Sequence, residues 1–228
     1  IEIESASDIH QLLKTVPGIY IQEEDGLGLR PNIGIRGATS ERSSKITLME
    51  DGVMIAPAPY SNPAAYYFPT TLRLNAIEVL KGAPILRYGP QTTGGVLNML
   101  STPIPKESGG ALNLIFGEDG QADLHANYGA RSGQFGFLIE TVQRSYDGFK
   151  DIDRSSQDSG FDIEDYVLKL AWEGERQSLL FKAQSSDEVS DETYLGLTDA
   201  DFNNDENRRY GLSSIDEMKN DHQGYNLT

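Results

Sequence analysis

Residues 106–228 alternate between apolar and polar side chains with a period of two, and this alternation restricts the possible folds more than any other feature of the chain. In the segment 121–130, Leu124 and Tyr128 share one face with three alanines, whereas Asp123 and Asn127 lie on the other. Successive side chains of a β-strand point to opposite faces of a sheet. The pattern therefore predicts a strand with one apolar and one polar face.

Further segments show or begin the same alternation, namely 110–117, 134–144, 164–173, 176–185 and 222–228. The second and fourth connections between these segments (131–133 and 174–175) are tight, whereas the third and fifth (147–160 and 187–220) are long. In an up-and-down sheet these two sets of connections lie at opposite ends. Tight turns at one end and long loops at the other are typical of an outer-membrane β-barrel.

The six predicted strands are fewer than the roughly eight strands of the smallest membrane barrel. We therefore interpret residues 106–228 as part of an incomplete antiparallel transmembrane β-barrel. Soluble sandwiches and barrels also alternate, so a soluble β-rich binding or adhesion domain stays an alternative. In the membrane interpretation Asp123, Asn127 and Lys169 face the barrel interior. The side chains expected to face lipid are Leu124, Tyr128, Leu168, Leu170 and Trp172.

The composition excludes several classes of function. The chain of 228 residues has a formal net charge of −16 at pH 7, which argues against a nucleic-acid partner because phosphate binding needs clustered Lys and Arg. Residues 1–105 carry 8 basic and 10 acidic groups, and residues 106–228 carry 11 and 25. The absence of cysteine excludes metal–thiolate sites and cysteine nucleophiles. No apolar run reaches the roughly 18 residues of a transmembrane helix.

Residues 1–105 have a different pattern, a helix followed by short strands, which predicts a small α+β domain. The helix is predicted over 5–18, with Ser5 and Asp8 at capping-box spacing and Pro17-Gly18 as its end. Its apolar stripe consists of Ile9, Leu12, Leu13 and Val16. The strands are predicted at 18–22, 32–37, 45–53, 76–82 and 94–102, with a hairpin turn at Asp51-Gly52.

Two segments resemble ligand-binding loops without matching them. The glycine-rich segment 89–95 lacks the Gly-Lys-Ser/Thr of a phosphate-binding loop, so its glycines are expected to serve tight backbone packing. The segment 151–162 has Asp151 and Asp153 at calcium-loop spacing, but Ser156 replaces the turn glycine and Asp162 the bidentate glutamate. We expect a solvated acidic loop there.

Several motifs, taken together, carry a family resemblance. The segments PNIGIRG (31–37), LMEDGV (48–53) and IEVLKGAPILRYGPQTTGGVLNMLST (77–102) look like signatures of a plug domain. The segments DGVMIAPAPYSNP (51–63) and ETYLGLTDADF (192–202) look like those of the ferric dicitrate receptor-like branch. On these residues the chain resembles the TonB-dependent outer-membrane receptors.

The resemblance implies a plug domain at residues 1–105 and the N-terminal part of a 22-stranded barrel at residues 106–228. It implies a monomeric receptor in the outer membrane of a Gram-negative bacterium, which contacts outer-membrane lipid and TonB of the inner-membrane complex. The cargo is expected to be a ferric chelate of the siderophore or ferric citrate type, with cobalamin or an oligosaccharide as the alternative. No catalytic residue and no cofactor are expected, since iron enters only as chelated cargo.

The resemblance also suggests roles for individual residues. Arg36 and Arg87 match arginines that in relatives pair with barrel-wall glutamates and lock the plug. An acidic protein repels an anionic chelate unless basic groups are concentrated at the mouth, so outward-facing basic and hydroxyl groups are expected to bind the ligand. These are Arg42, Ser43, Ser44, Lys45, Tyr60, Arg208 and Arg209. In the alternative interpretation, Arg208 and Arg209 only offset Asp205 and Glu206.

The beginning of the chain bears on what this segment can do alone. The sequence starts at Ile1 without an initiator methionine or a signal peptide, so we expect an N-terminal portion to precede it. The TonB box, which the family uses to contact TonB, is expected in that portion. We therefore do not expect this segment by itself to transport a ligand.

Overall fold

The computed structural model describes residues 8–23, 26–55, 67–88 and 93–228. The chain divides into two compact units, Ile1–Pro103 and Ile104–Thr228, and each is described by itself. Among the described residues, no helix has the length and apolar character needed to span a membrane.

The first unit is a small α+β domain with two sheets. A two-stranded sheet has the order β1-β2, and a four-stranded sheet has the order β4-β3-β6-β5. Its elements are α1 (Ile9–Leu13), β1 (Ile19–Gln22), β2 (Asn32–Ile35), η1 (Glu41–Ser43), β3 (Ile46–Glu50), β4 (Val53–Met54), η3 (Thr71–Arg73), β5 (Leu74–Leu80), η4 (Ala83–Tyr88) and β6 (Gly95–Ser101).

Helix α1 is shorter than the predicted 5–18. Its N-cap is Asp8, whose carboxylate accepts the backbone N–H of His10 at 2.7 Å, whereas Ser5 lies outside the described residues. The helix ends at Leu13, whose carbonyl oxygen accepts the Val16 N–H at 2.9 Å in a turn, and Gly18 with a φ of 77° leads the chain into β1. The apolar stripe is confirmed, since Ile9 and Leu13 are buried and Leu12 and Val16 pack against the same core.

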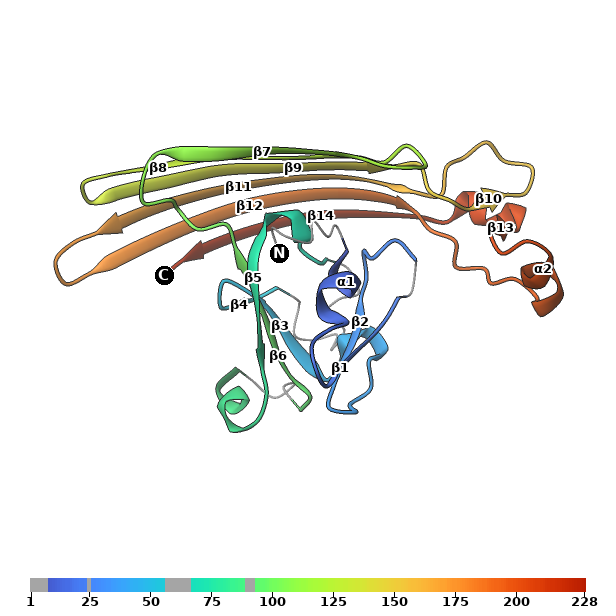
Figure 1. Cartoon of the computed structure of the whole chain (residues 1–228), viewed down its shortest axis with the longest axis horizontal. Helices are drawn as coiled ribbons and strands as arrows, with labels where there is room; N and C mark the ends of the chain where they lie inside the picture. Colours follow the sequence, from blue (N-terminus) through green and yellow to red (C-terminus); the bar gives the residue numbers. More distant parts are fainter. Residues whose placement is uncertain (1–7, 24–25, 56–66, 89–92) are drawn as a thin grey trace. The chain divides into compact units, whose positions relative to one another are not determined.

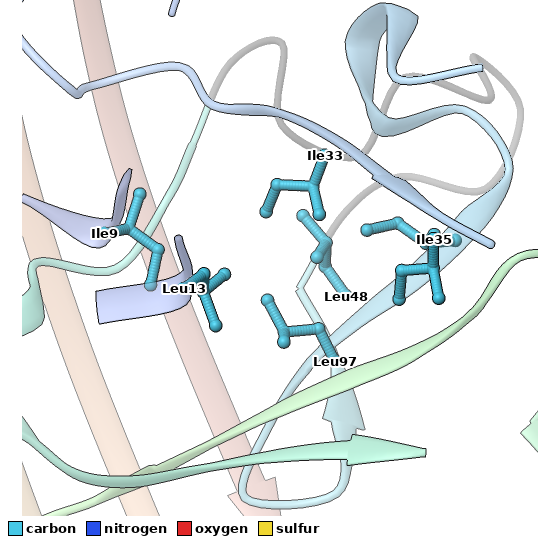
Figure 2. Packing of buried hydrophobic residues seen from close by; sticks show 7 residues of the cluster. Ile9, Leu13, Ile33, Ile35, Leu48 and Leu97 are labelled. Carbon is cyan, nitrogen blue, oxygen red and sulfur yellow. The ribbon is translucent and has the colours of Figure 1, made fainter. Parts of the chain in front are cut away.

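The core of this unit joins the helix to both sheets. Figure 2 shows Ile9 and Leu13 of α1 facing side chains from three strands. The strand side chains of the buried cluster are Ile33, Ile35, Ile46, Leu48 and Leu97. Full burial of one such side chain stabilises the fold by roughly 1.5–3 kcal/mol, so this cluster fixes the helix and the two sheets as one body.

The central pair of strands brings distant parts of the sequence together. Strand β3 pairs in parallel with β6, and the hairpin from β3 to β4 turns at Asp51-Gly52. Both turn residues have positive φ, 50° and 83°, as a type I′ turn requires. A Cβ at Gly95 would lie 2.8 Å from the carbonyl oxygen of Leu80, so the glycine permits close approach of β5 and β6. This bears out a packing role for Gly95.

A charged pair is buried beside this core. The guanidinium of Arg73 donates to both carboxylate oxygens of Glu50, and its Nη2 also donates to the Tyr67 hydroxyl at 2.8 Å. The side chains of Arg73 and Glu50 are 0% and 2% exposed. Removing one partner of a buried pair leaves an uncompensated charge, which costs more than the pair itself contributes.

The second unit is a six-stranded antiparallel sheet with a small group of elements at one end. The order of the sheet is β14-β12-β11-β9-β8-β7, and its strands run side by side in Figure 1. The elements are β7 (Gly109–Phe116), β8 (Ala122–Ser132), β9 (Phe135–Tyr146), β10 (Asp151–Ile152), β11 (Phe161–Glu173), β12 (Ser178–Asp191), α2 (Asp199–Asn204), β13 (Arg208–Arg209), η5 (Gly211–Ile215) and β14 (Glu217–Leu227).

The register places apolar side chains on one face across the whole sheet. One row reads Tyr128, Ile139, Leu168, Ala183 and Tyr225, each opposite the next. We call this the apolar face. Its exposed large side chains are Leu112, Leu114, Phe116, Tyr128, Phe135, Ile139, Tyr166, Leu168, Leu170, Leu179, Val189, Tyr225 and Leu227. The predicted alternation of residues in β8 and β11 is confirmed.

The other face, called the polar face, carries ionic pairs. Arg144 Nε lies 3.1 Å from Asp123 Oδ1, and His125 Nε2 lies 2.8 Å from Glu140 Oε1. Lys169 is buried on this face, directly opposite Lys182 of β12. Polar and charged side chains of β8, β9, β11 and β12 therefore lie on the polar face, together with the buried apolar side chains of Leu138, Val142, Phe161, Ile163 and Val167.

Three strands are longer than the sequence pattern indicated. Strand β12 continues to Asp191, and β14 begins at Glu217, although 187–220 was assigned to a loop. Between 187 and 191 polar side chains occupy both faces, so the hydropathy alternation ends while the backbone pairing of β12 with β14 continues. Strand β11 likewise starts at Phe161.

The buried pair generates the first prediction. Arg73→Met should lower the free energy of unfolding of this region by about 3–5 kcal/mol, because the buried carboxylate of Glu50 loses the guanidinium that compensates its charge. Hydrogen exchange of the β3 and β6 amides in the complete protein measures this loss. The double variant Glu50→Leu with Arg73→Met should lose less than the single variant. A double variant that loses the sum of the two single losses would contradict this account.

The apolar face generates the second prediction. Leu168→Arg should cost about 2–4 kcal/mol if it lies near the bilayer midplane, because a charge is placed in hydrocarbon. Glu164 lies on the same face of β11 and is already charged, so Glu164→Arg is the matched control and should change stability by less than about 1 kcal/mol. Urea unfolding of the complete protein in bilayers measures both. Equal losses would show that this face is not in lipid.

Candidate ligand-binding site

The two long connections of the second unit fold as one structure. Strand β10 pairs in parallel with β13, and Asp153 N donates to the carbonyl oxygen of Arg209 at 2.9 Å. Figure 1 shows β10, β13 and α2 together at one end of the sheet, with the tight turns at the other. We call residues 147–160 and 192–216 the loop module. The predicted separation of long and tight connections is therefore present in the structure.

Arg208 is the centre of the loop module. Its Nε donates to Asp153 Oδ1 at 2.9 Å and its Nη2 to Asp153 Oδ2 at 2.9 Å, so one edge of the guanidinium holds the carboxylate with two bonds. Its Nη1 donates to Asp201 Oδ1 at 2.8 Å. Bidentate pairs of this kind are stronger and more directional than single contacts between charges. Of the predicted partners, Asp205 accepts the backbone N–H of Arg208 at 3.3 Å, whereas the guanidinium binds Asp153 and Asp201.

The second acid in this cluster has partners of its own. Asp201 accepts hydrogen bonds from the Tyr210 hydroxyl and from Thr198 Oγ1, and these bonds, with Arg208, lower its pKa below the ordinary value. Thr198 is also the N-cap of α2, since its hydroxyl accepts Asp201 N at 3.2 Å. The short helix is thereby fixed relative to β13.

Other contacts between the two loops do not involve Arg208. Lys150 Nζ donates to Thr193 Oγ1 at 2.9 Å. Gln157 Nε2 donates to Asp191 Oδ1, at the end of β12, at 2.9 Å. The base of the loop module therefore has its own cross-links, independent of the guanidinium.

Arg209 contacts backbone carbonyl groups, whereas its neighbour Arg208 contacts carboxylates. Its Nη1 donates to the carbonyl oxygens of Glu206 and Arg208, at 2.8 and 2.7 Å. Burial lowers the pKa of Arg209, and the negative charge of Asp205 acts in the opposite direction and raises it. Arg209 thus closes a turn of the loop, and its role in ligand binding stays a prediction.

The predicted plug loop around residues 40–45 is built on one buried hydroxyl. Ser43 is fully buried, its Oγ donates to the carbonyl oxygen of Pro31 and accepts Ile33 N, both at 2.9 Å. The side chain that we expected to contact ligand therefore holds the loop to β2. Its placement corrects that expectation, because a hydroxyl with both bonds made inside the fold does not face a ligand.

The neighbouring side chains remain accessible. Lys45 is exposed, and Arg42 and Ser44 are partly buried. Arg42 has a positive φ of 51°, and its N–H donates to Asn32 Oδ1 at 2.6 Å. This hydrogen bond fixes the backbone of the loop at Arg42. Tyr60 lies outside the described residues. The ligand contacts of Arg42, Ser44 and Lys45 stay predictions.

The two predicted locking arginines are both exposed. Arg36 has a positive φ of 57°, and its N–H donates to the carbonyl oxygen of Gly18 at 2.9 Å. Arg87 places its guanidinium carbon 4.7 Å from the centre of the Tyr88 ring and donates to its hydroxyl. Their pairing with barrel-wall glutamates stays a prediction.

Acidic residues lie together both in the segment 151–162 and around Asp8. In the segment 151–162 the carboxylate of Asp153 forms an ion pair with Arg208. This carboxylate therefore binds a guanidinium in the structure and does not act as a calcium ligand. Within the described part of the chain, Asp8, His10 and Glu23 have ligand atoms within 4.8 Å of one another. Asp8 already caps α1 there, so this group is explained by the helix start.

Known proteins with this arrangement are receptors of one family. Residues 1–96 match the family model described as TonB-dependent Receptor Plug Domain. The vitamin B12 transporter BtuB of Vibrio vulnificus (strain CMCP6) is 28% identical over 219 residues, which cover 93% of this chain and 33% of that protein. Residues 1–96 therefore belong to the plug domains of TonB-dependent receptors, and the strands of the second unit follow them in the chain.

Solved structures show the same fold. The unliganded ferric citrate transporter FecA matches with a TM-score of 0.76 at 24% identity, over 90% of this chain and 32% of that one. The ferric yersiniabactin uptake receptor FyuA from Yersinia pestis matches with a TM-score of 0.65 at 20% identity, over 80% and 29%. The chain spans about a third of the length of these relatives. These relatives are transporters and an uptake receptor.

The loop module generates the third prediction. The hydrogen bonds from Arg208 lower the pKa of Asp153 below its ordinary value of 3.8. Because the folded pKa is lowered, the contact is fully present above the ordinary pKa and is lost as the pH falls through the lowered one. The distance between spin labels at Ser156→Cys and Asn204→Cys in the complete protein should therefore stay constant from about pH 7 to pH 5 and increase in stronger acid.

The control for this prediction is Arg208→Gln. This variant lacks the guanidinium that joins the two acids, so its label distance should already be long at neutral pH and change little with acid. A wild-type distance that is unchanged in strong acid, or that equals the Arg208→Gln distance at neutral pH, would contradict the role of the ion pair.

Proposed function

We propose that the complete receptor takes up an anionic ferric chelate of the ferric citrate type, with energy from TonB. The observation that carries this proposal is Arg208, which holds a carboxylate in two-bond geometry while 34% exposed on the loop module. A guanidinium in this position can bind a ligand carboxylate with the same two bonds. Lys45 and Arg42 on the plug loop supply further positive charge in a chain whose net charge is −16.

The fold is compatible with this cargo but does not select it. The structural match to the ferric citrate transporter covers 90% of the chain, at 24% identity. A receptor with a net negative charge needs local basic groups to attract an anion. Arg208 on the loop module and Arg42 with Lys45 on the plug loop are the groups proposed here, although the loop module as a whole carries 4 basic and 10 acidic groups. The ferric iron is cargo within its chelate, and the protein needs no cofactor of its own.

Cobalamin is the second candidate. The curated relatives at 25–28% identity from Vibrio and Photobacterium species are vitamin B12 transporters, and one of them aligns with 93% of this chain. Cobalamin does not offer the carboxylate groups that Arg208 would hold. Binding of ferric citrate and of cyanocobalamin to the complete receptor, measured side by side, separates the two candidates.

The charge argument generates the fourth prediction. Ferric citrate should bind the complete receptor more weakly after Arg42→Gln with Lys45→Gln, and after Arg208→Gln with Arg209→Gln, because each pair removes positive charge that faces the ligand. The expected loss for each pair exceeds threefold, about 0.65 kcal/mol. Titration followed by intrinsic fluorescence measures the dissociation constant.

Lys14→Gln is the control for this prediction. Lys14 is exposed at the end of α1 and lies outside both groups, so its removal tests the effect of one positive charge alone. The carboxylate assignment fails if neither pair of substitutions weakens ferric citrate binding more than Lys14→Gln does.

A further inference from the structure

The carboxylate-binding edge of Arg208 is already filled by a side chain of the same protein. Nε and Nη2 form the edge that a carboxylate matches best, and both donate to Asp153 at 2.9 Å. Asp153 comes from the first loop, 55 residues before Arg208 in the sequence. The pair thus joins the two loops through the same contact that an external carboxylate would make.

The Asp153 carboxylate can leave without dismantling the loop module. Both side chains are about one-third exposed, at 34% and 33%, so solvent and ligand reach the contact. The backbone of Asp153 is held separately, since its N–H donates to Arg209. The cross-link from Lys150 to Thr193 is also independent of Arg208. An exposed ion pair of this type exchanges partners at low cost, because solvent screens both states.

We propose that Asp153 is an internal competitor that occupies the carboxylate-binding edge of Arg208 until an anionic ligand displaces it. This inference rests on the proposed function, because it requires a cargo that carries a carboxylate. The ligand carboxylate takes the two hydrogen bonds of Nε and Nη2, while Asp201 stays on Nη1. Displacement removes one side-chain link between the two loops while the pairing of β10 with β13 stays, so ligand binding is coupled to the distance between the outer parts of the loops.

The coupling also acts as a specificity filter. A ligand must return two charge-assisted hydrogen bonds to Arg208 in order to replace Asp153 without loss. A neutral ligand offers no such exchange and leaves the two loops joined. Asp153 is therefore a specificity-determining residue that acts through Arg208, although it never contacts the bound ligand.

The test compares two substitutions in the complete receptor. Asp153→Asn keeps the size of the side chain and removes the charge that competes for Arg208. Asp158→Asn removes one negative charge from the same loop, at an exposed residue for which no contact to Arg208 is present. Ferric citrate should bind Asp153→Asn at least threefold more tightly than it binds Asp158→Asn.

A second measurement needs no substitution of Asp153. In the wild-type receptor labelled at Ser156→Cys and Asn204→Cys, ferric citrate should lengthen the distance between the loops, and cyanocobalamin should not. This chain has no cysteine of its own that would compete for the labels. The lengthened distance should equal that of the unliganded Asp153→Asn receptor.

Any result other than these two expected results overturns the proposal. If ferric citrate binds, but Asp153→Asn is equal to or weaker than Asp158→Asn, or the label distance does not change, Asp153 is not a competitor and the proposed function stands alone. If none of the three receptors binds ferric citrate, the carboxylate cargo is wrong, and the role of Asp153 fails together with it.

Discussion

The backbone register of the six-stranded sheet decides which face each side chain of its strands occupies. Because successive residues point to opposite faces, a slip of one residue would move Leu168 to the polar face and Lys169 to the apolar face. The same register aligns the ends of β9, β11, β12 and β14, from which the two long loops depart. One constraint therefore produces both a surface suited to lipid and a loop module at a single end of the sheet.

Charge is distributed in a way that follows from this constraint. On the polar face, Asp123 and His125 of β8 lie within hydrogen-bond reach of Arg144 and Glu140 of β9. In the first unit, the one fully buried arginine of the described residues, Arg73, has a bidentate partner. The pair of Arg208 and Asp153 on the loop module is about one-third exposed instead, and there the partners can exchange. Buried ion pairs thus have a structural role, whereas the partly exposed pair of Arg208 and Asp153 is accessible to a ligand.

Local patterns predicted the elements well and the long-range contacts poorly. The strands and the Asp51-Gly52 hairpin follow from alternation and turn chemistry, which act over a few residues. The partner of Arg208 is 55 residues away, and no local signal in a loop rich in acids distinguishes Asp153 from Asp205. Ser43 lies in a segment with the composition of a surface loop. Its side chain is nevertheless buried, because it bonds the backbone of Pro31 and Ile33 at the start of β2. Helix α1 and strand β12 differed in length because pattern marks the middle of an element better than its ends.

We propose above that the complete protein takes up a ferric carboxylate chelate with energy from TonB. Uptake of radiolabelled ferric citrate by cells that express the complete receptor tests it most directly, with and without a functional TonB, and with labelled cyanocobalamin in parallel. The account predicts ferric citrate uptake that requires both the receptor and TonB, and no uptake of cyanocobalamin by this receptor. Receptor-dependent uptake of cyanocobalamin without uptake of ferric citrate would contradict it.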